Sequence, residues 1–390
     1  MAEKKGVIVP KKLVWKHVVG QRRIRDTLGT AFENASLGHA YLFSGPVGVG
    51  KFQTALELAF ALLCNSTEEV PCYKCDACRQ ILTYAHPDFH CVFPLSLSKE
   101  HKAGGDSSKL SDDGWKYIAE QTRFKIENPY TVTESRIRHI PVEWIRELNH
   151  SIIRGTIQGN INVAIICDVD VMQAASANAM LKTLEEPPPN TIMFLLTPRP
   201  HAVLPTIRSR CQIIRFGSVA PDEATSALCR KTGLGPDDPK VVHAIAAAAG
   251  SYGSALMLVD ESLDVFAGQA QVLWELCVKN ASLFTVTAAL ESITQKYCGG
   301  GYDYAAGEKL LVAFLHIIRT TFFHGISGTE KYIKVTSSPE TAVPVTVETA
   351  ERLKTTCEQA IAAIRARGNI LMVLSTFFMS ISEIMHGEKY

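Results

Sequence analysis

The stretch Gly45-Pro46-Val47-Gly48-Val49-Gly50-Lys51-Phe52 decides how the first part of the chain folds. It follows the phosphate-loop pattern G-x-x-x-x-G-K-[ST], in which glycines let backbone N–H groups curl around phosphates and the lysine reaches their oxygens. The pattern fails only at its last position, where Phe52 replaces the hydroxyl residue that holds Mg²⁺. Apolar residues 40–43 predict a buried strand before the loop, and residues 52–63 predict a helix after it. We therefore expect the architecture of a nucleotide site that lacks one of its metal ligands.

The strand expected over residues 162–168 ends in Asp168, where the aspartate that holds Mg²⁺ in such a site would lie. The next residue is Val169, at the position where an ATP-hydrolysing protein has the glutamate that orients the attacking water. Asp170 comes one residue later, and on a continuing strand it would point to the same side as Asp168. With Phe52 and Val169 in these places, we expect very poor ATP hydrolysis by this site alone.

Further residues around the loop complete the predicted nucleotide site. Thr197 ends a strand expected over residues 191–197, at the carboxyl edge where ligands of parallel sheets bind. Val18 and Val19 precede the first strand, in a segment that lies over the adenine in many P-loop ATPases. The predicted nucleotide-binding residues are Val18, Val19, Gly45, Gly48, Gly50, Lys51, Asp168 and Thr197. The sequence leaves nucleotide binding without turnover open.

Four of the eleven cysteines follow the phosphate-loop helix with the spacing C-x7-C-x2-C-x2-C, and they are Cys64, Cys72, Cys75 and Cys78. Four thiolates at this spacing predict a tetrahedral Zn²⁺ that closes a small knuckle. Free buried thiols and redox chemistry are the alternatives. A site whose four positions are all filled by sulfur has none left for a substrate, so we expect a structural rather than a catalytic metal.

Composition indicates an ordinary protein of two or three domains, with 390 residues of which 46% are hydrophobic and 20% charged. The formal net charge of +1 excludes a strong basic field, so DNA contacts would be local or shared with partners. The first 25 residues carry eight Lys/Arg and one acid, which is typical of either a solvated tail or an arm facing nucleic acid. Neither a signal peptide nor a long apolar run is found, so we expect a cytoplasmic protein without membrane contact.

Strands and helices alternate from residue 13 to 216, which predicts an α/β domain with a mostly parallel sheet. Within it, residues 86–139 are polar and weakly periodic, and we expect a loop or insertion, about 91–139, that decorates the core. Residues 217–260 predict a three-helix lid. Residues 261–390 predict longer amphipathic helices, with an apolar stripe around Leu310 and Phe314 that is typical of a bundle core.

Several of these stretches together resemble the clamp-loader subunits of bacterial DNA polymerase III, which are AAA+ proteins. The resemblance covers residues 13–260 and is carried by the four-cysteine knuckle and by residues 38–43, 177–188 and 206–211. It implies a member of a hetero-oligomer that loads a sliding clamp onto primer-template DNA, as part of a DNA-directed DNA polymerase holoenzyme. Its partners would be the gamma/tau and delta subunits, and residues 261–390 would serve oligomerisation.

Within that family, Phe52 and Val169 indicate the delta-prime branch, whose nucleotide site is degenerate, rather than the gamma/tau motors. The alternative is a gamma/tau-like ATPase that tolerates Phe52, and a DNA-binding module acting through the knuckle is a second rival. Gly253 stands where the motors have a nucleotide-sensing arginine, which again favours a passive site.

The resemblance also implies a role for Arg210, within Ser209-Arg210-Cys211. In the family this arginine reaches a γ-phosphate bound by the neighbouring subunit, as a trans arginine finger. From the residues alone, an arginine paired with an acid before an edge strand is the simpler interpretation.

Overall fold

The computed structural model describes residues 11–95, 97, 101, 110–131, 140–259, 261–298, 306–307, 310–311, 313–315, 317–318, 347–365 and 369–386. These residues form two compact units. The first comprises the described residues up to 131, together with 140–224 and 250–253, and the second comprises the remainder. Within the described ranges, each helix is too short or too polar to cross a membrane.

The first unit is built on a sheet of five parallel strands in the order β4-β5-β6-β2-β7. Along the chain the strands are β2 (Ala40–Ser44), β4 (Phe89–Val92), β5 (Asn162–Ile166), β6 (Thr191–Thr197) and β7 (Gln212–Arg215). The register places Leu42 of β2 between Leu195 and Ile213. Because all five strands run the same way, their carboxyl ends meet at one edge. The α/β fold with a parallel sheet that the sequence predicts is confirmed.

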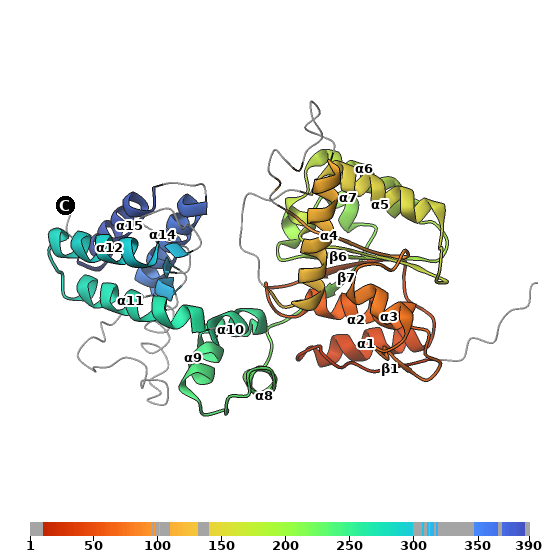
Figure 1. The fold of residues 1–390 in the computed structure, drawn as a ribbon, viewed down its shortest axis with the longest axis horizontal. Coiled ribbons are helices and arrows are strands. Elements are labelled where there is room, and N and C mark those ends of the chain that lie inside the picture. Colours follow the sequence, from red (N-terminus) through yellow and green to blue (C-terminus); the bar gives the residue numbers. More distant parts are fainter. Residues whose placement is uncertain are drawn as a thin grey trace, which may run out of the picture. The chain divides into compact units, whose positions relative to one another are not determined.

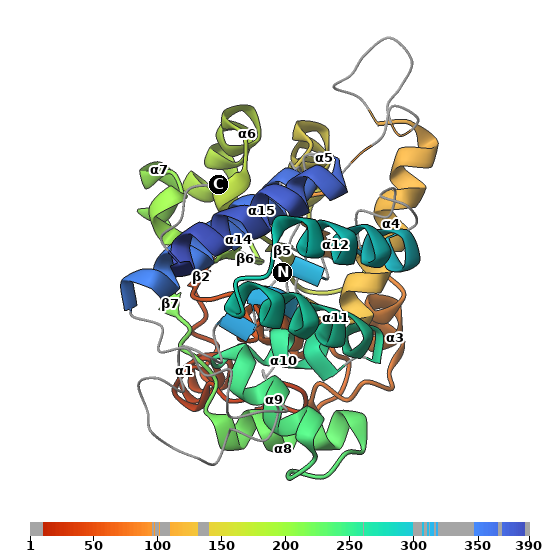
Figure 2. The same ribbon diagram turned by 90° about the vertical axis from the view of Figure 1, so that its left-hand side faces the viewer.

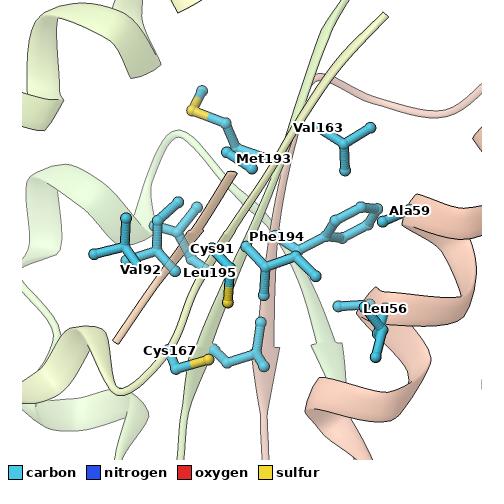
Figure 3. Packing of buried hydrophobic residues seen from close by; sticks show 14 of the residues in the cluster. Leu56, Ala59, Cys91, Val92, Val163, Cys167, Met193, Phe194 and Leu195 are labelled. Carbon is cyan, nitrogen blue, oxygen red and sulfur yellow. The ribbon is translucent and has the colours of Figure 1, made fainter. Parts of the chain in front are cut away.

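Helices cover both faces of this sheet, which explains why β2, β5 and β6 are buried along their whole length (Figure 1). The covering helices are α1 (Arg22–Glu33), α2 (Lys51–Leu63), α5 (Val142–Arg154) and α6 (Ala174–Glu185). Leu56 and Ala59 of α2 face Phe194 in the middle of the sheet (Figure 3). The apolar face of α5 is buried at Ile145 and Ile152.

The prediction that residues 86–139 only decorate the core is wrong. They contain edge strand β4 and a helix of 16 residues, α4 (Asp112–Glu127), whose Ile118 and Ile126 are buried in the main core. Helix α4 lies on the β4 side of the sheet, away from β7 (Figure 2). The weak polar pattern concealed α4 because only part of its surface is buried. Residues 96, 98–100, 102–109 and 132–139 of this stretch lie outside the described residues.

Smaller elements surround the sheet. Strand β1 (Lys12–Leu13) pairs with β3 (Glu69–Val70) in a separate two-stranded parallel sheet. The remaining short elements of the first unit are α3 (Asp76–Leu82), η2 (Val169–Val171), η3 (Pro200–Ala202) and α7 (Pro205–Arg208).

After β7 the chain is helical, as predicted. The described helices are α8 (Pro221–Thr232), α9 (Pro239–Ala248), α10 (Tyr252–Val259), α11 (Glu261–Val278), α12 (Leu283–Tyr297), α14 (Val347–Arg365) and α15 (Ile370–His386). The second unit has its own core, in which Leu310, Phe314 and Ile318 of the predicted stripe are buried. Parts of the predicted helical region 261–390 lie outside the described residues. The predicted division of this helical part into a lid, residues 217–260, and an oligomerisation domain, residues 261–390, stays a prediction.

Candidate functional site

The phosphate loop joins β2 to α2, and its backbone has the form that the glycines predict. Gly45, Gly48 and Gly50 have φ angles of 149°, 75° and 100°, in the region that disfavours residues with a Cβ. A Cβ on Gly45 would also lie 2.3 Å from the backbone oxygen of Phe216. The loop therefore keeps the curled backbone on which phosphate binding depends.

The lysine of the loop is engaged with the loop itself. Lys51 Nζ donates to the backbone oxygens of Gly45, at 2.7 Å, and of Pro46, at 2.5 Å. Burial lowers the pKa of Lys51 to about 8, although the carboxylate of Asp168 acts to raise it. Lys51 Nζ thus donates two hydrogen bonds to backbone oxygens of the loop, whereas in a nucleotide-bound loop phosphate oxygens would accept from this lysine.

Phe52 occupies the first turn of α2 as a core residue. Its side chain is only 7% exposed and belongs to the main hydrophobic cluster. The ammonium of Lys125, from α4, lies 4.8 Å from the centre of its ring. A buried phenyl ring held this way offers no oxygen to a metal ion.

The acidic residues after β5 do not continue the strand as expected. Strand β5 ends at Ile166, Asp168 has a φ of 50°, and Val169 begins the short η2 helix and is buried. The expectation that Asp170 would point with Asp168 assumed a continuing strand, and this assumption is wrong because β5 ends at Ile166.

Asp170 instead forms an internal network with the end of β6. Its carboxylate accepts from Thr197 Oγ1 at 2.8 Å and from Arg199 Nε at 2.8 Å, and its side chain is 1% exposed. Arg199 N also donates to Thr197 Oγ1. Thr197 lies at the predicted edge of the sheet, but its hydroxyl binds Asp170.

The segment that contains Val18 and Val19 lies beside the loop, and its predicted contact with adenine stays a prediction. Gln21 Nε2 donates to the backbone oxygen of Val49, which fixes the segment to the loop. Val18 is buried, and the backbone N–H of Val19 donates to the hydroxyl of Tyr130 at 2.8 Å. The structure thus brings the base-side and loop residues together around a side chain that the sequence did not indicate.

The four predicted metal ligands meet at the other end of α2. Cys64 follows the last residue of this helix, Cys72 and Cys75 lie in the loop after β3, and Cys78 lies in the first turn of α3. Their Sγ atoms all lie within 4.8 Å of one another, and the Cys64–Cys72 and Cys64–Cys75 separations are 3.5 and 3.9 Å. Four sulfurs bound at about 2.3 Å to one tetrahedral metal ion would be separated by about 3.8 Å. The cluster therefore fits a tetrahedral thiolate site.

Backbone N–H groups point at the sulfurs of this cysteine cluster. Ser66 N and Cys72 N donate to Cys64 Sγ at 3.4 and 3.5 Å, and Cys75 N donates to Cys72 Sγ at 3.4 Å. Such donors stabilise negative charge on a thiolate. All four cysteines are free of disulfide bonds, so their sulfurs remain available as ligands.

Arg210 follows α7 and precedes edge strand β7. Its Nη2 atom lies 2.8 Å from Glu185 Oε1, at the end of α6, and its Nη1 atom donates to the backbone oxygen of Thr206 at 2.8 Å. The arginine side chain is 34% exposed. In the chain by itself, Arg210 is thus paired with an acid, as the residues alone suggested.

Sequence reasoning missed Tyr130, Lys125 and Glu185 as neighbours of these sites. Ser111, with Asp112 and Asp113 after it, is a typical helix start, and Ser111 Oγ does cap α4 by accepting from Gly114 N. This signal could have located α4 and hence Lys125. Nothing in the local sequence indicates where Tyr130 packs.

Comparison with known proteins gives the family of the chain. Residues 20–220, more than half of the chain, match the family model described as "DNA polymerase III, delta subunit". DNA polymerase III subunit delta' of Bacillus subtilis (strain 168) is 30% identical over 201 residues, which is 52% of this chain and 49% of that protein. Subunit delta' of Pseudomonas aeruginosa is 27% identical over 220 residues, which is 56% of this chain and 53% of that protein.

A subunit of the other kind is about as similar. DNA polymerase III subunit gamma/tau of Mycobacterium tuberculosis (strain ATCC 25618 / H37Rv) is 29% identical over 250 residues, which is 63% of this chain and 36% of that protein. The matches span about half the length of these relatives or less. Delta' and gamma/tau are therefore not separated by identity, but the chain belongs to the DNA polymerase III delta-subunit family.

Proposed function

We propose that this chain is a clamp-loader subunit of a bacterial DNA polymerase III, of the delta-prime kind, which does not hydrolyse ATP itself. The observation that carries the proposal is the burial of two side chains at the positions where a working phosphate loop would hold Mg²⁺ and water. Phe52 and Val169 are both buried in the core at the two positions that would supply the magnesium hydroxyl and the water-orienting carboxylate. A site without either group lacks the parts that position Mg²⁺ and water for phosphoryl transfer.

In this proposal the chain contributes Arg210 to a neighbouring motor subunit. A partly exposed ion pair such as Arg210–Glu185 is worth only about 0–1 kcal/mol, so a neighbour's phosphate could replace Glu185 at little cost. A guanidinium then spreads positive charge over the phosphoryl oxygens through several donors. Glu185 would hold the side chain in place until the subunits assemble.

The four cysteines would hold a structural Zn²⁺. Their donor set, with four thiolates and no oxygen or nitrogen ligand, suits zinc, and closed coordination by sulfur suits a structural site. The ion would tie the end of α2 to the loop after β3 and to the start of α3. In this AAA+ protein, residues 217–260 would be the lid and residues 261–390 the oligomerisation domain. The family relationship supports a cytoplasmic location and partners of the gamma/tau and delta kinds, with the sliding clamp and primer-template DNA met through the assembly.

The test is the ATPase rate of a loader reconstituted with clamp and primed DNA, in which only this chain carries Arg210→Ala. We expect a fall of tenfold or more with the assembly intact, since trans arginine fingers contribute on the order of 10³ or more. Arg208→Ala is the matched control, because Arg208 ends the same short helix and bonds the backbone oxygen of Pro200. An unchanged rate with Arg210→Ala would make this arginine structural and remove the proposed catalytic contribution.

A gamma/tau-like ATPase is the second candidate. It is favoured by the intact glycines and Lys51, and by the similar identity to gamma/tau subunits. Mg²⁺-dependent ATP turnover by the purified chain alone discriminates between the two. We expect no turnover above that of a Lys51→Ala control, whereas turnover that depends on Lys51 would establish the second candidate.

A further inference from the structure

Tyr130 lies against the segment that contains Val18 and Val19. It follows α4, and its side chain is 9% exposed. Its hydroxyl accepts from the backbone N–H of Val19 at 2.8 Å and donates to the backbone oxygen of His17 at 3.1 Å. These two backbone groups belong to the segment predicted to cover the adenine, and one side chain satisfies both of them.

The hydrogen-bonding pattern of this contact matches that of adenine. Adenine presents a ring-nitrogen acceptor beside an amino donor, so a neighbouring backbone N–H and C=O can read its edge. A phenol hydroxyl combines one donor and acceptor lone pairs in a single atom. Tyr130 therefore occupies one backbone donor and one backbone acceptor, the combination that an adenine edge also requires.

The ring is fixed against the phosphate loop and against the start of α10. A Cβ placed on Gly50 would lie 3.3 Å from the Tyr130 hydroxyl, so the side chain touches the loop next to its last glycine. Tyr252 packs edge-on against the ring, with centroids 4.8 Å apart at 87°. The same segment is also held by Glu57, which accepts from the backbone N–H groups of Lys16 and His17.

A second side chain near Tyr130, that of Lys125, lies against Phe52, which stands at the position of the missing magnesium ligand. The ammonium of Lys125 lies 4.8 Å from the ring centre of Phe52 and 5.3 Å from that of Phe93. A cation held over two aromatic rings is attracted by their π-electrons. Lys125 thus sits against the residue that replaces the magnesium ligand, five residues before Tyr130.

We propose that Tyr130 is a built-in occupant of the adenine pocket, held there by α4, and that an adenine nucleotide binds only when Tyr130 leaves. The chain thereby prevents the relic site from filling with ATP, instead of merely failing to hydrolyse it. This inference rests on the proposed relic nucleotide site and not on assembly with other subunits. A ligand that must displace a docked group has its affinity reduced by the fraction of molecules in which the pocket is open.

The experiment measures the binding of ADP, ATP and GTP to the full chain by equilibrium dialysis. We expect wild type to bind ADP with a Kd of about 1 mM or weaker. Tyr130→Ala should bind ADP about tenfold or more tightly than wild type, because the pocket is then open in every molecule. GTP should gain little, since guanine presents an acceptor oxygen where adenine has its amino donor. Tyr130→Phe, which keeps the ring and loses both hydrogen bonds, should show a smaller gain.

Two further variants make the result specific. Phe124→Ala, on the exposed face of α4, should leave ADP binding unchanged. Adding Lys51→Ala to Tyr130→Ala should abolish the gain, which assigns it to the phosphate loop. Unchanged ADP affinity in both a folded Tyr130→Ala and Tyr130→Phe would overturn the inference, as would tight binding by wild type. Reconstitution of wild type with gamma/tau and delta subunits is scored separately, so a failure of assembly contradicts the proposed function and leaves the Tyr130 result standing.

Discussion

The two ends of α2 have opposite characters. At its first turn lies a phosphate loop whose backbone has the expected curled form. The chain's own groups contact its lysine, Lys51, the ring of Phe52 at the metal-ligand position, and the backbone of Val19. Directly after the last residue of α2 begins a cysteine cluster whose four sulfurs lie within 4.8 Å of one another. One helix therefore connects a nucleotide site that the protein's own side chains occupy to a cysteine cluster in which the metal-binding sulfurs lie together. Binding depends on side chains that converge on the place of the ligand, and the curled backbone of the phosphate loop does not by itself ensure this.

The largest expected effect is at the cysteine end. Cys64→Ser, or removal of zinc by a chelator, should cause loss of the metal and a large fall in melting temperature, because structural zinc sites bind with about 10–16 kcal/mol in small domains. Zinc content by mass spectrometry and thermal melting measure this outcome. Cys211→Ser is the matched control, since Cys211 is partly buried and lies outside the cluster, and it should retain the zinc. Full stability of a zinc-free Cys64→Ser protein would contradict the comparison.

Phe52→Thr should have the next largest effect, and it tests the end of α2 that carries the phosphate loop. Removing a buried phenyl ring from the core should cost about 3–5 kcal/mol of the free energy of unfolding, reduced somewhat by the new side chain. The restored hydroxyl should not restore ATP hydrolysis, since Val169 and Tyr130 remain. Denaturant unfolding and an ATPase assay measure the two effects. Val47→Ala in the same loop is the control, because Val47 is exposed and should change stability by only about 0.5 kcal/mol.

Asp170→Ala should have a smaller effect of about 1–3 kcal/mol, because it leaves the hydroxyl of Thr197 without its acceptor in a buried place. Arg199→Ala removes only the exposed partner of the same carboxylate and should cost less, about 1 kcal/mol. Equal effects of the two variants in denaturant unfolding would mean that the ion pair, rather than burial, holds the end of β6.

An effect that appears only at acid pH concerns His90 in β4. Burial lowers the pKa of His90 to about 4, and the carboxylate of Asp88 acts in the opposite direction. Because the unfolded chain binds this proton more readily, stability is full above about pH 6.5 and falls as the pH decreases toward 4. His90→Asn should reduce this slope in denaturant unfolding between pH 6.5 and 4. An unchanged slope would assign the acid sensitivity to other groups, such as His86, whose pKa burial also lowers.

Local patterns predicted most of the sheet and the cysteine cluster. Strand β6 has the predicted bounds, and the cysteine spacing identified the four residues that meet, because each signal lies within a few consecutive residues. The phosphate loop was equally readable, since glycine positions report backbone shape.

Long-range contacts could not be predicted in this way. Tyr130 and Val19 are 111 positions apart, and only the packing of α4 brings them together. Likewise, the position of Asp170 depends on where β5 ends, and a count of alternating residues carries no information once the strand has ended. The residues that fill the nucleotide site therefore come from the part of the chain whose sequence pattern was weakest.

The most direct test of the account measures both ends of α2 in one sample. The purified full chain is dialysed against Mg²⁺ and ATP at about 50 μM, well below the expected Kd of about 1 mM, and bound zinc and bound nucleotide are counted per chain. The account predicts close to one zinc ion and almost no nucleotide. A chain that holds one nucleotide in a Mg²⁺-dependent manner would contradict it, because Phe52, Lys125 and Tyr130 would then not close the loop.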